Sequence, residues 1–95
     1  FHGGVSGAIA DNAAGFAAMT LMDKDKEPLT IEFKINFLNI ADGEKLVAEA
    51  EILQAGRSIF HGESKVYTIK KKEKLLTATA LVTIKATSKV SEKLR

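Results

Sequence analysis

The chain has 95 residues, 14 Lys and Arg against 12 Asp and Glu, a net charge of +2 and 45% hydrophobic residues. This length supports one domain with a modest core. The near balance of charges and the few aromatic residues give no case for nucleic-acid binding. The absence of cysteine excludes disulfides and thiolate metal sites, and it favours the cytoplasm. Because the chain opens at Phe1 rather than Met, we expect residues 1–95 to form a single domain that lacks an N-terminal segment.

A helix is predicted from about Val5 to Met22, within the stretch HGGVSGAIADNAAGFAAMTLM. Its residues are small or apolar on nearly every side, which is typical of a helix enclosed by other elements. The stretch has about the length of a membrane span. Asp11, the interior glycines and the lack of a basic flank argue against that interpretation. We therefore expect a soluble protein with no membrane span.

Four antiparallel strands are predicted after a polar connection at 23–28, and we expect them to meander. They cover Thr30–Leu38, Lys45–Gln54, Arg57–Ile69 and Leu75–Lys85. The first strand alternates strictly, which predicts that its apolar side chains face a core and that Thr30 faces the other way. The pattern indicates the α+β class, with a curved sheet that closes around the apolar helix.

Glycines and charged segments mark the predicted turns between these strands. Asp42-Gly43 is the strongest hairpin signal. Gly56 breaks the second strand, and Gly62 predicts a bulge or bend inside the third. A charged hairpin is expected at 70–74, and the polar tail at 86–95 is expected to fray.

Asp11 is the first candidate for a functional residue. A carboxylate in an apolar helix costs several kcal/mol unless it is paired, hydrated or neutralised. The alternative is an aspartate that is merely hydrogen-bonded to a nearby strand or to Asn12. About 13 Å of helix rise separates Asp11 from His2, so a substrate held at the helix start needs a carboxylate from elsewhere. The same helix of a neighbouring subunit is one source.

Gly3 and Gly4 at the helix start suggest a site for an anion or a developing oxyanion, because free backbone N–H groups point outward there. The alternative is an N-terminal turn that simply needs glycine. For His2 we favour a positioning or capping role over proton transfer. His61 is expected to be a solvated strand residue. The two histidines share no metal-ligand spacing with each other or with a carboxylate, so no metal or other cofactor is expected.

Two further segments carry polar groups that are candidates for function. The Thr30 hydroxyl could orient water, although threonine is common in strands. Gly56-Arg57-Ser58 could meet a phosphate, because guanidinium pairs with phosphate through two hydrogen bonds. An ordinary hairpin turn is the alternative for this segment, and it is favoured on local grounds.

Taken together, these features resemble the PaaI-like (phenylacetyl-CoA thioesterase type) branch of the hotdog-fold acyl-CoA thioesterases. The resemblance rests on HGGVSGAIADNAAGFAA, on TIEFKINFLNIADGEKLVAEAEILQAGRS and on LLTATALVTI, and it covers nearly the whole chain. It implies a long central helix wrapped by a curved antiparallel sheet. It also implies a homodimer formed through that sheet and often paired again into a homotetramer. The family's usual Asn before the His-Gly-Gly motif lies outside this sequence.

The resemblance further implies hydrolysis of acyl-CoA thioesters with no cofactor. The Gly3 N–H would polarise the thioester carbonyl, with His2 shaping that site. Asp11 of the partner subunit would act as general base or nucleophile, and Thr30 would help to place the water or the acid. The residues expected to bind substrate or CoA are Gly4, Gly56, Arg57 and Ser58.

Two other functions compete with hydrolysis. One is a non-catalytic module of the same fold that binds acyl-CoA, for which a carboxylate inside an apolar helix has no purpose. The other, weaker alternative is a dehydratase of the same fold. Such an enzyme needs a His–Asp type pair, which His61 is not placed to supply.

Overall fold

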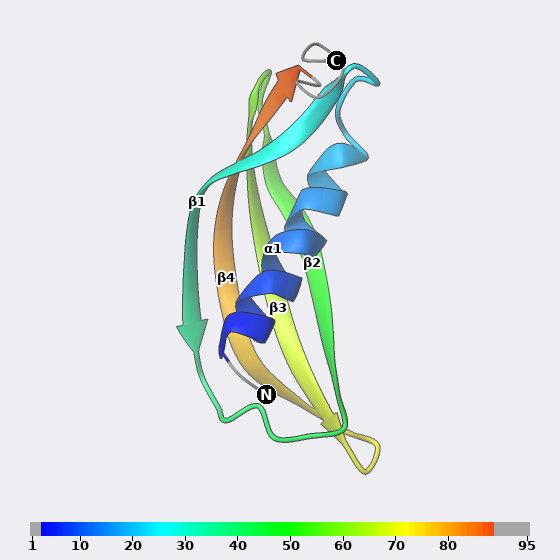
Figure 1. Ribbon diagram of the computed structural model, residues 1–95, viewed down its shortest axis with the longest axis vertical. Coiled ribbons are helices and arrows are strands. Elements are labelled where there is room, and N and C mark those ends of the chain that lie inside the picture. The colour runs from blue at the N-terminus through cyan, green and yellow to red at the C-terminus, as the bar shows by residue number, and fades with distance from the viewer. Residues whose placement is uncertain (1–2, 89–95) are drawn as a thin grey trace.

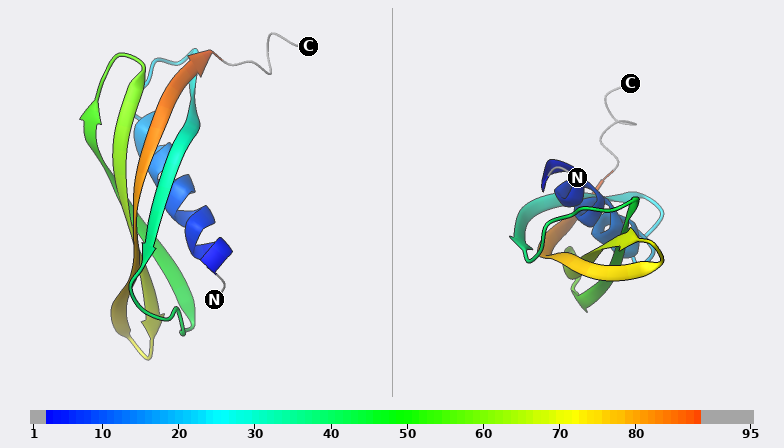
Figure 2. Two further views of the ribbon diagram at one scale, coloured as in Figure 1. Left: turned by 90° about the vertical axis from the view of Figure 1, so that its left-hand side faces the viewer. Right: turned by 90° about the horizontal axis from the view of Figure 1, so that it is seen from below.

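The computed structural model describes residues 3–88, in which one helix packs on a four-stranded antiparallel sheet (Figure 1). This arrangement confirms the expected α+β hotdog architecture. Figure 2 shows α1 lying against one face of the curved sheet, while the other face carries no element of the described residues. The elements are α1 (Gly3–Met19), β1 (Lys26–Phe37), β2 (Lys45–Ala55), β3 (Ile59–Lys70) and β4 (Glu73–Ser88).

The strand order is β1-β4-β3-β2, so the predicted four-strand meander is wrong. Only β2, β3 and β4 follow one another as neighbours, and β1 pairs with β4. Residues 38–44 therefore cross from one edge of the sheet to the other instead of forming a hairpin (Figure 1). Gly43 is needed there for close packing, since a Cβ would lie 2.8 Å from the Ile69 carbonyl oxygen.

A β-bulge in β1 reverses the predicted orientation of Thr30. Thr30 pairs with Ile84, but Glu32 pairs with Thr83, so Ile31 is an extra residue. Such an insertion shifts the alternation of side chains by one position. Thr30 therefore shares a face with Phe33, toward α1, and the predicted strict alternation holds only beyond the bulge.

The main contact between α1 and the sheet is a row of small residues, which we call the seam. Gly62 on β3 faces it: Ala14 Cβ lies 3.6 Å from the position that a Cβ on Gly62 would take. The Ser64 hydroxyl donates a 2.6 Å hydrogen bond to the Ala10 carbonyl oxygen. The predicted bulge at Gly62 lies instead on the neighbouring strand, between Ile52 and Gln54. The buried seam residues are Ser6, Ala10, Ala14 and Ala18.

Several predicted boundaries shift by a few residues. The helix ends at Met19 rather than Met22, because the next turn tightens: the Leu21 N–H donates to the Ala18 carbonyl at 2.9 Å. β1 begins at Lys26, within the predicted connection. The charged hairpin at 70–74 is confirmed, with Lys71 and Lys72 both at positive φ. Of the tail, 86–88 belong to β4, and 89–95 lie outside the described residues.

Candidate functional site

A groove of about 690 Å³ lies between α1 and the edge strand β1. Its size falls in the range of about 300–1,000 Å³ that is typical of small-molecule sites. Glycines on the helix side leave the space open, and aromatic rings form the opposite wall. The groove is lined by Gly3, Gly4, Gly7, Ala8, Asp11, Phe33, Ile35 and Phe37.

Asp11 is partly buried in this groove and is held by Thr30. The Thr30 hydroxyl donates a hydrogen bond of 2.6 Å to Asp11 Oδ1. The bond requires the bulge at Ile31, because without it the hydroxyl would face the other side of the sheet. The sequence proposed both residues separately, and the structure brings them together. A carboxylate has about four acceptor positions, so Asp11 can accept further hydrogen bonds beside the one from Thr30.

Gly3 begins α1, and its N–H is among the first four of the helix, which have no acceptor within it. The Phe37 ring lies 3.1 Å from the position that a Cβ on Gly3 would take, so any side chain here would press against the ring. Gly4 has no atom within 4 Å of its corresponding position and faces open space. His2 lies outside the described residues, so its predicted role is not tested.

Gly3 and Asp11 line the same groove but cannot meet at one atom. Eight residues of helix separate them, which is about 12 Å of rise. A nucleophilic attack needs reacting groups within about 3–3.5 Å of each other. One chain therefore places the first N–H groups of α1 at one end of the groove and a carboxylate further along it.

The Gly56-Arg57-Ser58 segment forms the turn between β2 and β3. This outcome agrees with the ordinary hairpin turn that was the alternative prediction for the segment. The Gly56 N–H donates to the Ile59 carbonyl at 2.9 Å, and the Ser58 carbonyl accepts from Ala86 N–H at 2.7 Å. Arg57 also lines a small pocket of about 240 Å³ together with Lys26. Sequence analysis missed Lys26, because it placed that residue in a surface connection.

The four residues predicted to bind substrate or CoA do not gather within one chain. The pocket of Arg57 includes Leu21 and Met22, which follow the C-terminal end of α1. Gly4 lies at the N-terminal end of the same helix, at the other end of its length in Figure 1.

The face of the sheet away from α1 is mostly polar, with exposed Leu29 and Leu81 among its side chains, and it is remote from the groove. His61 is exposed there, as expected. Lys74 lies 2.8 Å from Glu49 and 4.1 Å from the centre of the Tyr67 ring. The hydrogen bond to Glu49 raises the pKa of Lys74 above its ordinary value. Within residues 3–88, no three potential His, Asp or Glu ligands gather as a metal site, and no helix is suited to crossing a membrane.

Comparison with known proteins identifies similar sequences and folds. A sequence profile of the thioesterase superfamily matches residues 1–75. A thioesterase family protein from Silicibacter pomeroyi is 35% identical, with a TM-score of 0.91 over 93% of this chain and 65% of that one. No curated protein matches the chain.

Two more distant structures share the fold. A Bacillus halodurans protein crystallised with CoA is 24% identical, with a TM-score of 0.85 over 90% of this chain and 58% of that one. A thioesterase from Haemophilus influenzae is 23% identical, with a TM-score of 0.82 over 93% and 59%. The chain thus spans less than two thirds of the length of each of these three structures.

Proposed function

The chain belongs to the thioesterase superfamily, and we propose that it hydrolyses acyl-CoA thioesters to the free acid and CoA, as the PaaI-like enzymes do. The observation that carries the proposal is the 2.6 Å hydrogen bond between Thr30 and Asp11 beside an apolar groove. A carboxylate oriented by a strand residue is suited to acting on a bound thioester. The CoA in the Bacillus halodurans structure supports this choice of substrate.

In the proposed reaction, the Gly3 N–H donates to the thioester oxygen and stabilises the negative charge that develops on it. As a general base, Asp11 removes a proton from the water that attacks the carbonyl carbon. As a nucleophile, it attacks that carbon itself, and water then hydrolyses the anhydride. In both cases the carbon–sulfur bond breaks, and the CoA sulfur leaves with the electron pair and takes up a proton.

We propose that each active site is shared by two chains, with Gly3 from one and Asp11 from the partner subunit. A two-fold axis between antiparallel α1 helices would bring each Asp11 toward the other helix's start and create two equal sites. Exposed apolar side chains on α1 and on the edge strand support such a contact. They include Phe16, Met19, Leu29 and Ile31. We expect these dimers to pair again into a tetramer.

The same arrangement brings the proposed CoA-binding residues together. Antiparallel helices place the C-terminal end of α1 in one chain beside the N-terminal end in the other. The turn at 56–58 would then lie near Gly4 of the partner subunit. Arg57 and Lys26 offer two cations in one pocket, and they are suited to the phosphates of CoA.

A thiol-release assay over a panel of acyl-CoAs tests the proposed function. We expect release by the parent protein, and we expect Asp11→Asn to lower turnover by about 10²–10⁴-fold. Stability should be unchanged or raised, because the substitution removes a partly buried charge. Turnover by the variant within tenfold of the parent would remove Asp11 from the mechanism. A parent that binds acyl-CoA but releases no thiol would identify the non-catalytic binding module instead.

A further inference from the structure

Phe37 stands between the groove and a second pocket of about 490 Å³. Gly3 and Phe37 are the two residues that line both spaces. The ring lies 3.1 Å from the position that a Cβ on Gly3 would take, so it stands beside the helix start, between the two spaces. The second pocket is otherwise lined by Ser6, Leu38, Asn39, Ile40, Ala41 and Thr77.

The crossover loop at 38–44 forms one wall of the second pocket. The first residues of the loop are hydrogen-bonded to β4. The Leu38 N–H donates to the Thr77 carbonyl at 2.8 Å. The Asn39 side-chain amide donates to the Leu76 carbonyl at 2.9 Å. These bonds join the loop to β4, so the pocket has a wall before any ligand binds.

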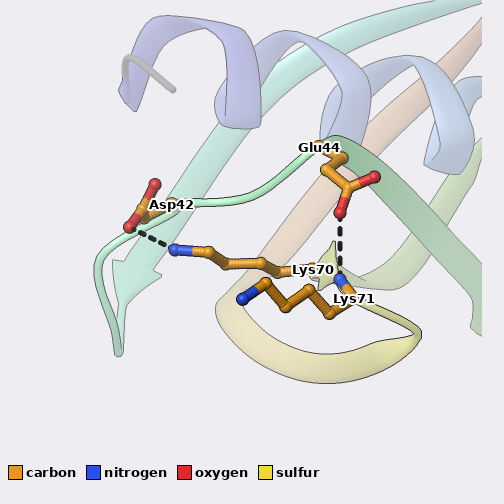
Figure 3. Close-up of polar contacts among 4 residues, drawn as sticks. All are labelled: Asp42, Glu44, Lys70 and Lys71. Atoms are coloured by element: carbon orange, nitrogen blue, oxygen red, sulfur yellow. Dashed lines mark hydrogen bonds and ion pairs between the residues drawn. The ribbon is translucent and has the colours of Figure 1, made fainter.

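The far end of the loop is held by the β3–β4 hairpin (Figure 3). Lys70 forms an ion pair of 3.2 Å with Asp42, and the Lys71 N–H donates to Glu44 Oε1 at 3.0 Å. Exposed pairs of this kind contribute little to global stability. Their effect here is local, because they fix the loop over the end of the sheet.

We infer that Phe37 limits the length of the acyl group, an inference that rests on the proposed hydrolysis. A carbonyl held at the Gly3 N–H lies at the junction of the two spaces. With the ring against Gly3, the acyl group is confined to the groove beside Phe33 and Ile35. The Phe37 side chain is 57% exposed, so removing its ring disturbs little packing and opens the second pocket to the acyl chain.

A ladder of straight-chain acyl-CoAs from butyryl to dodecanoyl tests this role through kcat/KM. Each buried methylene changes affinity by about fourfold. We therefore expect Phe37→Ala to raise kcat/KM for the long chains relative to butyryl by about tenfold or more. Phe33→Ala is the matched control, because it removes a ring from the groove without touching the second pocket. Because it enlarges the groove without opening the second pocket, it should shift the preferred length far less than Phe37→Ala does.

A double variant tests whether the acyl chain enters the second pocket. Adding Ala41→Phe to Phe37→Ala fills the second pocket and should restore the preference for short chains. If Phe37→Ala unfolds at too low a temperature for the assay, Phe37→Leu opens the second pocket to a smaller extent. Parallel length profiles for the parent, Phe37→Ala and Phe33→Ala would overturn the inference while leaving hydrolysis intact.

Binding of non-hydrolysable alkyl-CoA thioethers separates this inference from the proposed reaction. If the parent releases no thiol from any acyl-CoA, hydrolysis fails, but calorimetry still measures affinity against alkyl length. A shift toward long alkyl chains in Phe37→Ala supports the role of Phe37 even then. An unchanged length preference contradicts it.

Discussion

Helix α1 presents two rows of small residues with the same four-residue spacing, and the two rows have opposite effects. The seam is fully buried, and its methyl and hydroxyl groups fill the space against β3 and β4. The other row faces β1, and its two glycines leave the space that forms the groove. The seam consists of Ser6, Ala10, Ala14 and Ala18, and the groove row consists of Gly3, Gly7 and Asp11.

The difference shows that small residues on a helix can either allow close packing on the sheet or leave space in which a ligand can bind. In the seam, the contacts are completed within the same chain: the Ser64 hydroxyl donates a hydrogen bond to the Ala10 carbonyl oxygen, and Ala14 packs against Gly62. In the groove row, Asp11 accepts a hydrogen bond from Thr30, but the Gly3 N–H, the proposed oxyanion donor, lies about 12 Å of helix rise away. Packing is thus completed by one chain, whereas the proposed chemistry needs two.

Mixing two inactive variants tests that contrast most directly. Asp11→Asn removes the carboxylate, and Gly3→Pro removes the N–H while remaining compatible with the first turn of a helix. If each site draws on both chains, a statistical mixture should regain up to about a quarter of parental activity, since half of the dimers then hold one complete site. Thiol release measures the recovery.

Mass analysis must first confirm that mixed dimers have formed. A mixture of Asp11→Asn with Asp11→Ala is the control, because no pairing of these chains restores a carboxylate. Mixed dimers of the first pair without recovered activity would show that Gly3 and Asp11 are not shared between chains.

The seam should respond to added volume far more strongly than an exposed position beside the groove. We expect Ala14→Leu to lower the free energy of unfolding by about 1–3 kcal/mol or more, because Gly62 and its neighbours leave no space. Ala8→Leu adds the same volume at an exposed position beside the groove and should change stability by less than about 0.5 kcal/mol. Urea titrations compare the two variants. Equal losses of unfolding free energy in the two variants would show that the seam is packed no more tightly than the helix face beside the groove.

Removing the hydroxyl of Thr30 should weaken catalysis moderately. We expect Thr30→Val to lower kcat by about tenfold with little change in KM, because Asp11 loses a hydrogen bond worth about 1–2 kcal/mol. Thr30→Ser keeps the hydroxyl and should retain most of the activity. Equal kcat values for the valine and serine variants would show that the hydrogen bond does not orient the carboxylate for the reaction.

The smallest effect is expected at Gly7, where a side chain would stabilise the helix but would also narrow the groove. A Cβ there would lie 3.7 Å from the Phe33 ring, which is an ordinary contact. Gly7→Ala should therefore stabilise the helix by about 0.5–1 kcal/mol while narrowing the groove and lowering kcat/KM. Gly15→Ala is the matched control, because Gly15 does not line the groove. It should give a similar gain in stability without narrowing the groove.

Local sequence patterns were sufficient for the elements and for the main functional candidate. The apolar helix, the strands and the hairpin at 70–74 follow from periodicity and turn residues, which act over short stretches of chain. Asp11 could be singled out because a carboxylate conflicts with its apolar neighbours. The resemblance to hotdog thioesterases added the family, and the match over residues 1–75 bears it out at the level of the superfamily.

Tertiary structure alone decided the strand order, the bulge at Ile31 and the pairing of Thr30 with Asp11. These features depend on contacts between residues far apart in sequence, and β1 and β4 in particular pair residues that are 41 to 62 positions apart. A bulge carries no local signal when the surrounding residues alternate well, yet it turns every earlier side chain to the opposite face. The position of Thr30 beside the carboxylate follows from that one extra residue, which only the pairing with β4 reveals.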